Sequence, residues 1–521
     1  MVGAGTMGAG IAQVAALAGY ETLLHDPYEQ ALARGLDLIE TGLEKGAERG
    51  RWTAEKADSA WQQLQAVSSL QDLSRCDLVI EAVPEDVDLK RELFARLSEL
   101  CEPEAILATN TSSLPVTALA SAAARPGNVV GMHFFNPAPL MELLEVVAGT
   151  DSSPEAVEAA RAVGIRMGKR VIIARDGPGF LANRCARPFG MEALRLLQQG
   201  IADHATIDRI VRMGGGFRMG PFELMDLVGI DVGFEVSKSF WEQSFHEPRW
   251  QPSMIQARMV QAGRFGRKAG RGYYDYGAGP HREEDPRLPT PSGGGRVAVE
   301  GEGRLAEELR DLAGKVGYEV GTLERFPEID VELVIDATVG RSPSDTVLVI
   351  ESTRVAHCIL CVDGSLADLD AAGNAVGFHA LPPLSESRLV ELTRSSQTPD
   401  GTAERTEAFF RSLGKHVDWV GDAPGLVLGR IVSQLVNEAA FALAEGVGSV
   451  EGVDTALRHG FNYPRGPLEW ADTIELDQVL STLDALYDEL HEDRYRVAPL
   501  LRQMVAEGRL GRSMGEGFYE Y

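Results

Sequence analysis

A glycine-rich segment near the start of the sequence has the spacing that binds the pyrophosphate of a dinucleotide. Residues 3–8 read Gly-Ala-Gly-Thr-Met-Gly, which fits G-x-G-x-x-G, and they open a stretch, 9–17, with a helical pattern. The glycines permit a tight turn and close backbone approach, and the helix N-terminus supplies N–H groups and a positive dipole. Asp26 follows at the end of a second predicted strand, where its carboxylate would accept from a ribose 2′-hydroxyl and favour NAD over NADP. The alternative is a plain glycine-rich turn. The predicted cofactor-binding residues are Gly3, Gly5, Thr6, Met7, Gly8 and Asp26.

His133 and Glu145 form a second candidate, because each stands in an apolar, strand-like run. A carboxylate buried in such a run needs a charged or hydrogen-bonding partner, and a histidine on the adjoining strand would supply one. Oxidation of an alcohol needs a base that takes the hydroxyl proton as hydride leaves carbon. Imidazole suits this task at neutral pH, and a carboxylate on its other nitrogen fixes the tautomer. The alternative is a purely structural His–Glu hydrogen bond.

The elements that would position these residues alternate between strands and helices. Apolar runs at 77–83, 105–109 and 128–132 predict strands in stacked βαβ units with a mainly parallel sheet over residues 1–175. Helical patterns such as 191–199 and 230–242 predict a helical domain over 176–276. Residues 277–295 collect Gly, Pro and charged residues, which is typical of a linker.

The predicted first strand is essentially absent, because only Met1 and Val2 precede Gly3. Either the true chain begins upstream of a misassigned start, or the sheet is damaged at its centre. We favour the first explanation, since the second half keeps a strand, 296–299, before its own Gly301-Glu302-Gly303.

The second half looks like a copy of the first. Similar segments recur at an offset of 246 positions: Gly131-Met132-His133 and Gly377-Phe378-His379, 176–180 and 422–426, and 220–223 and 466–469. This indicates an internal duplication with a shortened α/β part at 296–421 and a second helical domain at 422–521. The predicted fold class is therefore α/β plus all-α, a Rossmann-type domain and a helical domain with the pair repeated in degenerate form.

Composition excludes several classes of protein. At roughly 150 residues per domain, 521 residues suggest about three to four domains. A hydrophobic fraction of 44% and a charged fraction of 24% are ordinary for globular proteins. The net charge of -27 opposes binding to nucleic acid. No segment predicts a secretion signal or a membrane span, and five scattered cysteines suggest reduced thiols, so we expect a cytoplasmic protein without a membrane partner.

Six segments together carry a resemblance to a known family. They are, in order, Gly3–Gly8, Glu81-Ala82-Val83-Pro84-Glu85, Asn110-Thr111-Ser112-Ser113, His133-Phe134-Phe135-Asn136-Pro137, Asp176-Gly177-Pro178-Gly179-Phe180 with Asn183, and Lys268-Ala269-Gly270. With these the chain resembles the NAD-dependent 3-hydroxyacyl-CoA dehydrogenases over essentially all of its length. The resemblance implies NAD as cofactor and an acyl-CoA as substrate.

The resemblance also implies roles for single residues. His133 and Glu145 would form the catalytic dyad, with Ser112 and Asn183 hydrogen-bonding the substrate near its reacting oxygen. The residues implied to line the cofactor are Glu85, Lys90, Ser112, Asn136 and Lys268. Taken singly these residues have ordinary explanations, namely a helix cap for Ser112, a turn residue for Asn183 and a solvated charge for Lys268.

Substrate phosphates would need a local basic patch in so acidic a protein. Lys45 and Arg49, with Arg51, resemble in position the helix that contacts coenzyme A in the family. An ordinary exposed helical face is the alternative.

The second half departs from the family pattern. His379 and Glu391 keep the dyad spacing, but Pro382 stands for Asn136, Gly429 for Asn183 and Ser513 for Lys268, and Glu302 lies where phosphate would bind. We therefore expect a non-catalytic half whose helical domain packs on the first, as an intrachain pseudo-dimer that leaves homo-oligomerisation open. Cys358 and Cys361 lack a second pair at zinc spacing, so we expect buried thiols and no metal.

The tandem layout and residues 462–470 and 494–496 most resemble the family members that oxidise 3-hydroxyadipyl-CoA in phenylacetate degradation. The alternative within the family is a 3-hydroxybutyryl-CoA dehydrogenase of fatty-acid or butanoate metabolism. The alternative from another class is a non-catalytic binding protein on the same scaffold.

Overall fold

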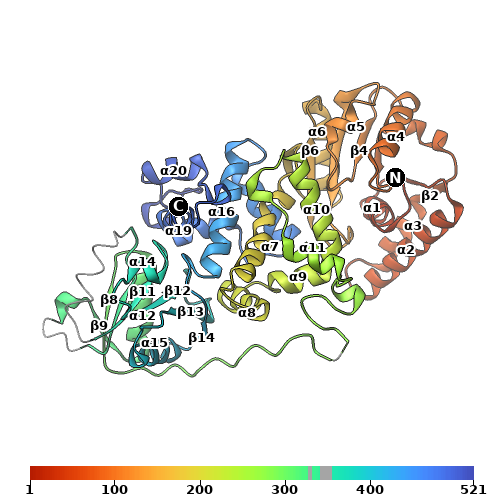
Figure 1. The fold of residues 1–521 in the computed structure, drawn as a ribbon. Helices are drawn as coiled ribbons and strands as arrows, with labels where there is room; N and C mark the ends of the chain where they lie inside the picture. Colours follow the sequence, from red (N-terminus) through yellow and green to blue (C-terminus); the bar gives the residue numbers. More distant parts are fainter. Residues whose placement is uncertain (278, 327–330, 341–354) are drawn as a thin grey trace. The chain divides into compact units, whose positions relative to one another are not determined.

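The computed structural model describes residues 1–277, 279–326, 331–340 and 355–521 (Figure 1). The chain divides into two compact units, the first of Met1–Arg184 with Glu445–Phe461, the second of Cys185–Ala444 with Asn462–Tyr521. Among the described residues no helix combines the length and the apolarity needed to cross a membrane.

The first unit is a sheet with helices on both faces. Its strands are β1 (Thr22–His25), β2 (Leu64–Val67), β3 (Leu78–Glu81), β4 (Ile106–Thr109), β5 (Val129–Phe134), β6 (Leu143–Ala148) and β7 (Arg170–Arg175). Its helices are α1 (Thr6–Leu17), α2 (Glu29–Glu48), α3 (Ala54–Gln62), α4 (Val87–Leu100), α5 (Val116–Ala120), α6 (Pro154–Arg166) and α17 (Val450–Gly460). Strands β3 to β7 are ordered as in the chain, and all neighbours are parallel except β5 and β6.

Strand alternation divides the core of this sheet between its two faces. Val130, Met132 and Val146 share one apolar cluster with residues of α1 and α6. The alternate residues face α5 and α17, since a Cβ on Gly131 would meet Val116 at 3.1 Å, and one on Gly460 would meet Leu143 at 2.6 Å. His133 and Glu145 have the parity of Gly131 and Leu143, so they lie on this second face.

Between β1 and β3 the sheet is completed by three residues, Met1–Gly3. Val2 bridges both His25 and Glu81 in parallel register. The backbone bonds are Val2 N to Ile80 O (2.9 Å), Ala82 N to Val2 O (2.8 Å), His25 N to Met1 O (2.9 Å), Gly3 N to His25 O (2.8 Å) and the Met1 ammonium to Leu23 O (2.7 Å).

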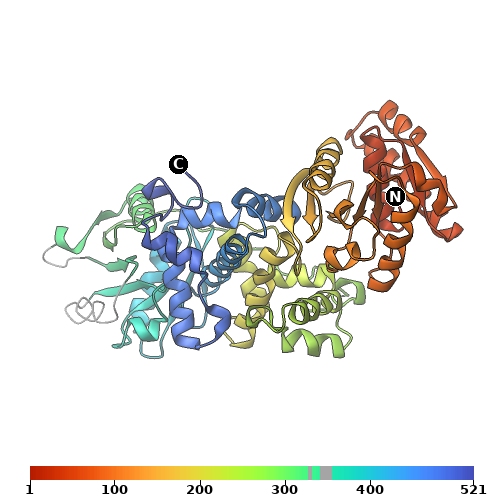
Figure 2. The same ribbon diagram turned by 90° about the horizontal axis from the view of Figure 1, so that it is seen from above.

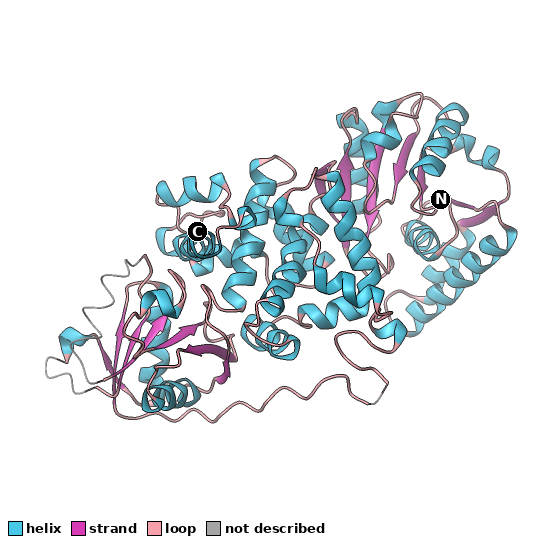
Figure 3. Ribbon diagram, viewed as in Figure 1, coloured by secondary structure: helices cyan, strands magenta, loops and turns pink. Residues whose placement is uncertain are grey.

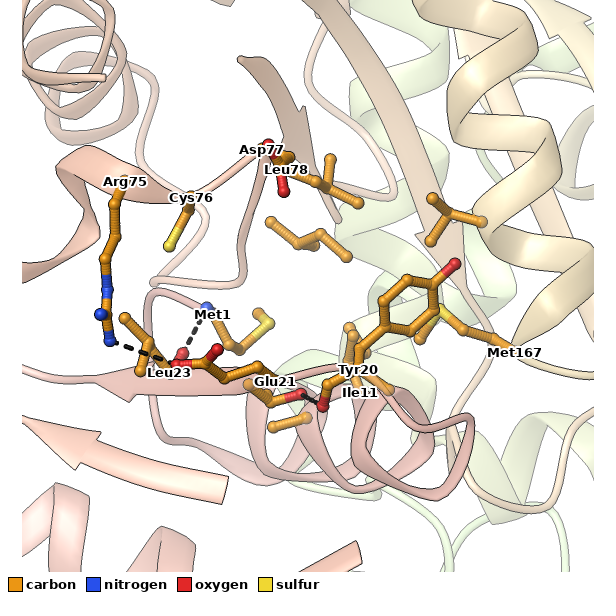
Figure 4. Close-up of a pocket in the computed structure, with 15 residues that line it drawn as sticks. Met1, Ile11, Tyr20, Glu21, Leu23, Arg75, Cys76, Asp77, Leu78 and Met167 are labelled. Carbon is orange, nitrogen blue, oxygen red and sulfur yellow. Dashed lines mark hydrogen bonds and ion pairs between the residues drawn. The ribbon is translucent and has the colours of Figure 1, made fainter. Parts of the chain in front are cut away.

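A cavity of about 290 Å³ lies next to Met1, between β1 and β3. Met1, Leu23, Leu78, Ile11 and Met167 are among the residues that line it (Figure 4). We name this cavity the strand slot.

The second unit contains a seven-stranded sheet and two groups of helices. The strands are β8 (Arg296–Glu300), β9 (Glu319–Gly321), β10 (Leu333–Asp336), β11 (Ala356–Leu360), β12 (Val376–His379), β13 (Leu389–Arg394) and β14 (His416–Trp419), in the order β14-β13-β12-β11-β10-β8-β9. Here a full strand, β8, lies between β9 and β10, and among the strands of the described residues only β12 and β13 are antiparallel neighbours.

Along the chain, one group of helices of the second unit comes before its sheet, some helices lie between its strands, and another group comes after it. Figure 3 distinguishes the helices from the strands by colour. The helices between the strands are α12 (Arg304–Val316), α14 (Leu366–Leu369) and α15 (Asp400–Ser412). The first helical group is α7 (Ala182–Gln198, starting in the first unit), α8 (His204–Gly215), α9 (Pro221–Val228), α10 (Ile230–Gln243) and α11 (Met254–Gln261). The second is α16 (Leu428–Ala444), α18 (Pro467–Ile474), α19 (Leu476–Leu490) and α20 (Pro499–Ala506).

The two helical groups contact each other inside the second unit, whose helices are seen end-on and side-on in Figure 2. Arg430 is 1% exposed and its Nε lies 2.5 Å from Glu192 Oε1, while Arg249 Nη1 lies 2.8 Å from Glu438 Oε2. Buried ion pairs of this kind need close geometry, because both charges have left water.

The predicted strands at 77–83, 105–109 and 128–132 and the helix at 230–242 agree with the observed elements to within a few residues, whereas the helix expected at 191–199 begins earlier, at Ala182. One further difference is informative. The helix expected to start at residue 9 begins at Thr6, inside the glycine-rich loop, so the N–H groups of Thr6 and Met7 belong to its first turn. The predicted linker, 277–295, contains no helix or strand among its described residues.

Candidate active site

The glycine-rich loop has the geometry of a phosphate cradle. Gly3 has φ +95°, and a Cβ there would stand 2.6 Å from Ala82 O. A Cβ on Gly8 would stand 1.9 Å from Gly3 O, whereas one on Gly5 would meet nothing within 4 Å. Gly3 and Gly8 are thus required by close packing, and Gly5 leaves the approach to the helix open. No side chain caps the N-terminus of α1, so its first N–H groups remain available to an anion.

Asp26 lies at the end of β1 and is tied to this loop. Its Oδ2 accepts from Ala4 N at 2.9 Å and its Oδ1 from Tyr28 N at 3.0 Å. The carboxylate is therefore held beside the loop, where the sequence predicts the ribose contact.

Antiparallel pairing of β5 and β6 places His133 directly opposite Glu145. His133 Nδ1 lies 2.7 Å from Glu145 Oε2, and the two residues are 6% and 0% exposed. Glu145 Oε1 accepts from Leu181 N (3.2 Å) and Ala182 N (2.8 Å), at the start of α7. Because the carboxylate can only accept, Nδ1 carries the hydrogen and Nε2 is left as the basic atom.

Asn183 follows directly after the two N–H groups that hold Glu145 and lies in the first turn of α7. The loop that carries Ser112 is fixed to the histidine strand in a similar way, because Asn110 Oδ1 accepts from Phe134 N at 2.8 Å. Ser112 is exposed and its N–H donates to Glu85 at 3.2 Å.

Glu85 and Lys90 belong to a network that the sequence did not reveal. Lys90 is 1% exposed, and its Nζ lies 2.9 Å from both Glu81 Oε1 and Glu85 Oε2. Burial would raise the pKa of Glu85, but the Lys90 ammonium and the Thr111 hydroxyl hold that pKa below its usual value. Lys90 is thus turned to these two carboxylates, and it positions Glu85 at the loop of Ser112.

Glu81 belongs to the same network and was not among the predicted site residues. It is 0% exposed and accepts from Lys90, from Thr109 Oγ1 at 2.7 Å and from Val83 N at 2.6 Å. The signal in the sequence was a carboxylate inside the apolar strand 78–83, like that of Glu145.

Other predicted residues are not brought to the dyad by any contact among the described residues. Asn136, Lys45 and Arg49 are exposed residues of the first unit. Lys268 belongs to the second unit, where its Nζ lies 2.7 Å from Asp231.

The pair at the matching positions of the second half, His379 and Glu391, has no open space beside its imidazole. His379 Nδ1 lies 3.8 Å from Glu391 Oε1, and both ring nitrogens lack a hydrogen-bond partner within the described chain. A Cβ on Gly429 would stand 2.2 Å from the His379 ring, so the backbone of α16 fills the space beside it. Glu391 still accepts from Val427 N (2.7 Å) and Leu428 N (3.0 Å).

No group of three or more ligating side chains in the described ranges could hold a metal ion. Cys358 and Cys361 are buried free thiols, and burial raises the pKa of each.

Comparison with known proteins gives consistent matches. The family model for the 3-hydroxyacyl-CoA dehydrogenase NAD binding domain matches residues 1–177, and that for the C-terminal domain matches 179–276 and 425–521. The 3-hydroxyadipyl-CoA dehydrogenase of Escherichia coli K12 is 37% identical over 96% of both chains. A probable 3-hydroxybutyryl-CoA dehydrogenase of Deinococcus radiodurans is 40% identical over 53% of this chain and 99% of its own. The crystal structure of a 3-hydroxybutyryl-CoA dehydrogenase from Escherichia coli superimposes with a TM-score of 0.81 at 34% identity, covering 97% of this chain and 98% of its own.

Proposed function

The chain belongs to the 3-hydroxyacyl-CoA dehydrogenase family of NAD-dependent oxidoreductases, and we propose that it oxidises an L-3-hydroxyacyl-CoA to the 3-oxoacyl-CoA at His133. The observation that carries this proposal is the buried contact of 2.7 Å between His133 Nδ1 and Glu145, with the other carboxylate oxygen held by two backbone N–H groups.

The side chains account for the proton in this reaction. Nε2 of His133 takes the proton of the substrate hydroxyl, and the imidazolium that forms is stabilised by Glu145 through Nδ1. Glu145 cannot turn away, because the N–H groups of residues 181 and 182 hold it. Asn183 and Ser112 are proposed to donate to the forming 3-oxo group, since neutral donors polarise a carbonyl without competing for the proton.

The glycine-rich loop fits NAD. Close packing at Gly3 and Gly8 and the uncapped start of α1 provide the pyrophosphate site, and Asp26 is proposed to bind the adenosine ribose. When bound, the nicotinamide accepts the hydride. Thr6 and Met7 are proposed to contact the phosphates through their N–H groups, and Glu85, positioned by Lys90, to line the nicotinamide end together with Asn136 and Lys268.

For the acyl group we propose 3-hydroxyadipyl-CoA, in aromatic catabolism, because the match to the relative of that name extends over 96% of both chains. 3-Hydroxybutyryl-CoA is the second candidate, favoured by the name of the similar crystal structure. Lys45 and Arg49 remain the proposed contacts for coenzyme A phosphates. None of the five cysteines forms a disulfide bond in the described residues, which is in line with the cytoplasmic location that we propose.

We also propose that the chain is an internal duplication folded as a pseudo-dimer. For some contacts between a residue of the first half and one of the second half, the residues at the matching positions, 246 apart, also contact each other. Such reciprocal contacts are expected of an isologous interface. Gly421 N donates to Ile201 O at 2.7 Å in the second unit, and Arg175 N donates to Val447 O at 2.8 Å in the first, each residue shifted by 246.

Side-chain contacts show the same reciprocal pairing of matching positions. Tyr495 Oη lies 3.0 Å from Glu192, and the matching positions Arg249 and Glu438 are paired at 2.8 Å. The closed pair at His379 supports one active site per chain.

The test of the proposed reaction is the rate of NADH formation with 3-hydroxyadipyl-CoA and with 3-hydroxybutyryl-CoA. We expect turnover with both and a higher kcat/KM for the dicarboxylic substrate. Glu145→Gln should keep KM and lower kcat by about 10²–10⁴-fold, the usual range for a lost acid–base function. No turnover with either substrate, despite NADH binding, would favour the binding-protein alternative.

A further inference from the structure

Helix α7 carries three arginines, and one of them has no carboxylate partner. Arg184 Nη1 lies 2.7 Å from Glu445 Oε2, and Arg195 Nη1 lies 2.7 Å from Glu192 Oε2. Arg187 makes no ion pair and no hydrogen bond to any residue that the structure describes, and its Nε is enclosed without a partner. The guanidinium of Arg187 is therefore left for a group from outside the chain.

An aromatic ring orients the Arg187 guanidinium without supplying a negative charge. Its Cζ lies 4.5 Å from the centre of the ring of Phe240, a residue of α10 that is 2% exposed. Burial lowers the pKa of Arg187 from 12.5 to about 10, with no opposing charge among the described residues. The side chain is still protonated at neutral pH, so an anion that reaches it would compensate a charge that the fold leaves uncompensated.

A ligand has access to this group, because Arg187 is only partly buried. Nη1 and Nη2 are not among its enclosed atoms. A Cβ on Gly190, three residues further along α7, would meet only the Met225 sulfur outside its own helix, at 3.9 Å. The surrounding segments, in α7, α9 and α10, adjoin no undescribed residue. The space beside this turn is open, and a carboxylate there would accept from both Nη groups.

Arg187 lies one helical turn after Asn183, on the same face of α7. Asn183, Ala186, Arg187 and Gly190 are partly exposed and recur at intervals of three and four residues. The start of this helix is fixed to the dyad, because the N–H groups just before Asn183 hold Glu145. From Asn183 to Arg187 the helix rises by about 6 Å.

This rise suits a dicarboxylic acyl chain. In a 3-hydroxyadipyl group three C–C bonds separate C3 from the distal carboxylate carbon, a span of about 4 Å when extended. With the C3 oxygen at Asn183, as proposed above, the distal carboxylate lies within reach of a guanidinium one turn along the helix. A 3-hydroxybutyryl chain ends one bond beyond C3 and would leave Arg187 without a partner.

We propose that Arg187 determines specificity by binding the distal carboxylate of a dicarboxylic acyl-CoA. This inference rests on the proposed function and deepens it, since it names the contact that separates the adipyl from the butyryl substrate. At the positions 246 residues later, Gly429 matches Asn183 and Ser433 matches Arg187. The half that we propose to be non-catalytic therefore keeps neither contact.

Isothermal titration of the full chain with two unreactive acyl-CoAs tests the proposal. Adipyl-CoA and hexanoyl-CoA have the same chain length and differ at the end, which is a carboxylate in one and a methyl group in the other. Neither carries the 3-hydroxyl group that the reaction needs. With NADH saturating, the parent should bind adipyl-CoA about 10–100-fold more tightly than hexanoyl-CoA, as expected for hydrogen bonds to a charged group.

Two variants locate the contact. Arg187→Met should remove the preference and leave the affinity for hexanoyl-CoA unchanged, because methionine keeps an apolar stem without the charge. Arg187→Lys should keep part of the preference, since an ammonium retains the charge but not the two parallel donors. Arg161→Met, at an exposed arginine of α6, is the matched control and should bind both acyl-CoAs as the parent does. NADH titration of each variant, which should be unchanged, shows that it is folded.

Initial rates supply a second readout that a merely structural arginine would not give. In Arg187→Met, kcat/KM for 3-hydroxyadipyl-CoA should fall about 10–100-fold, whereas kcat/KM for 3-hydroxybutyryl-CoA should not fall.

Two binding results would overturn the proposal, even if the parent oxidises both hydroxyacyl-CoAs. They are equal affinity of the parent for adipyl-CoA and hexanoyl-CoA, and a preference that persists in Arg187→Met. A preference that depends on Arg187, in a chain that forms no NADH with either hydroxyacyl-CoA, would support the carboxylate site and count against the proposed reaction.

Discussion

A strand added before Met1 should fill the strand slot and stabilise the first unit. In a parallel ladder alternate residues bond to opposite neighbours. Ile80 O already accepts from Val2, so the Leu78 N–H and C=O and the Ile80 N–H point into the slot, with the Leu23 N–H opposite. A three-residue extension such as Val-Ile-Val, placed behind a short polar leader, would meet these four groups.

The expected stabilisation is the sum of new hydrogen bonds and newly buried apolar surface, less the cost of ordering the added residues. Four hydrogen bonds contribute about 4 kcal/mol, and three buried apolar side chains about 6 kcal/mol. Ordering three residues costs about 6–8 kcal/mol. The extension should therefore raise the free energy of unfolding by about 2–4 kcal/mol when the terminal amine is uncharged.

The stabilisation should increase as the pH falls. Burial lowers the pKa of the Met1 ammonium from 8.0 to about 6. Between these values the unfolded chain binds more protons than the folded chain, so this group makes the parent lose about 2 kcal/mol of stability from pH 8 down to pH 6. The extended chain carries an amide at Met1 and should not show this loss, so its advantage should reach about 4–6 kcal/mol at pH 6.

Urea unfolding at pH 6 and pH 8.5 measures the contribution of the added strand and that of the Met1 charge. Acetylation of Met1 is the control that removes the charge without adding a strand, and Ser-Gly-Ser is the control of equal length. If the Val-Ile-Val extension, acetylation and the Ser-Gly-Ser extension stabilise the protein equally, the added strand does not contribute. If the stabilisation does not depend on pH, the charge of the Met1 ammonium does not contribute. Because Met1–Gly3 lead into the cofactor loop, NADH should also bind the extended chain more tightly.

Three further predictions concern single side chains. His133→Ala should lower kcat by about 10²–10⁴-fold, while His379→Ala leaves kcat within about twofold, and comparable losses in initial-rate assays would contradict a single active site. His379→Leu should raise the free energy of unfolding in urea by about 1–2 kcal/mol, because it removes two buried nitrogens without partners; a destabilised variant would show that the imidazole has an unseen role. Lys90→Met should cost about 3–5 kcal/mol, since it leaves Glu81 buried and uncompensated, and a loss below about 1 kcal/mol would show that the network is not held by this charge.

The sequence by itself determined the local parts of this protein. The glycine spacing of residues 3–8 predicted a tight turn before a helix, although the packing of Gly3 on Ala82 depends on a distant part of the chain. The apolar run 128–132 predicted the buried strand that is observed at Val129–Phe134. The apolar runs around His133 and Glu145 predicted a pair on neighbouring strands, because a carboxylate buried in such a run needs a hydrogen-bonding partner. The similar segments 246 positions apart, on which the proposed duplication rests, could be found without a structure because they are a property of the sequence alone.

Only the tertiary structure decided which charged side chains are buried and that the space beside His379 is filled. The resemblance implies that Lys90 lines the cofactor, but the folded protein buries Lys90 between Glu81 and Glu85. His379 keeps the spacing of a catalytic residue, yet the backbone at Gly429 closes the space beside it. The helix α17, far from β6 in the sequence, packs on the face that carries the dyad. Burial of a charge and closure of a pocket depend on groups distant in the chain, and their free energies are fixed only when the fold brings those groups together.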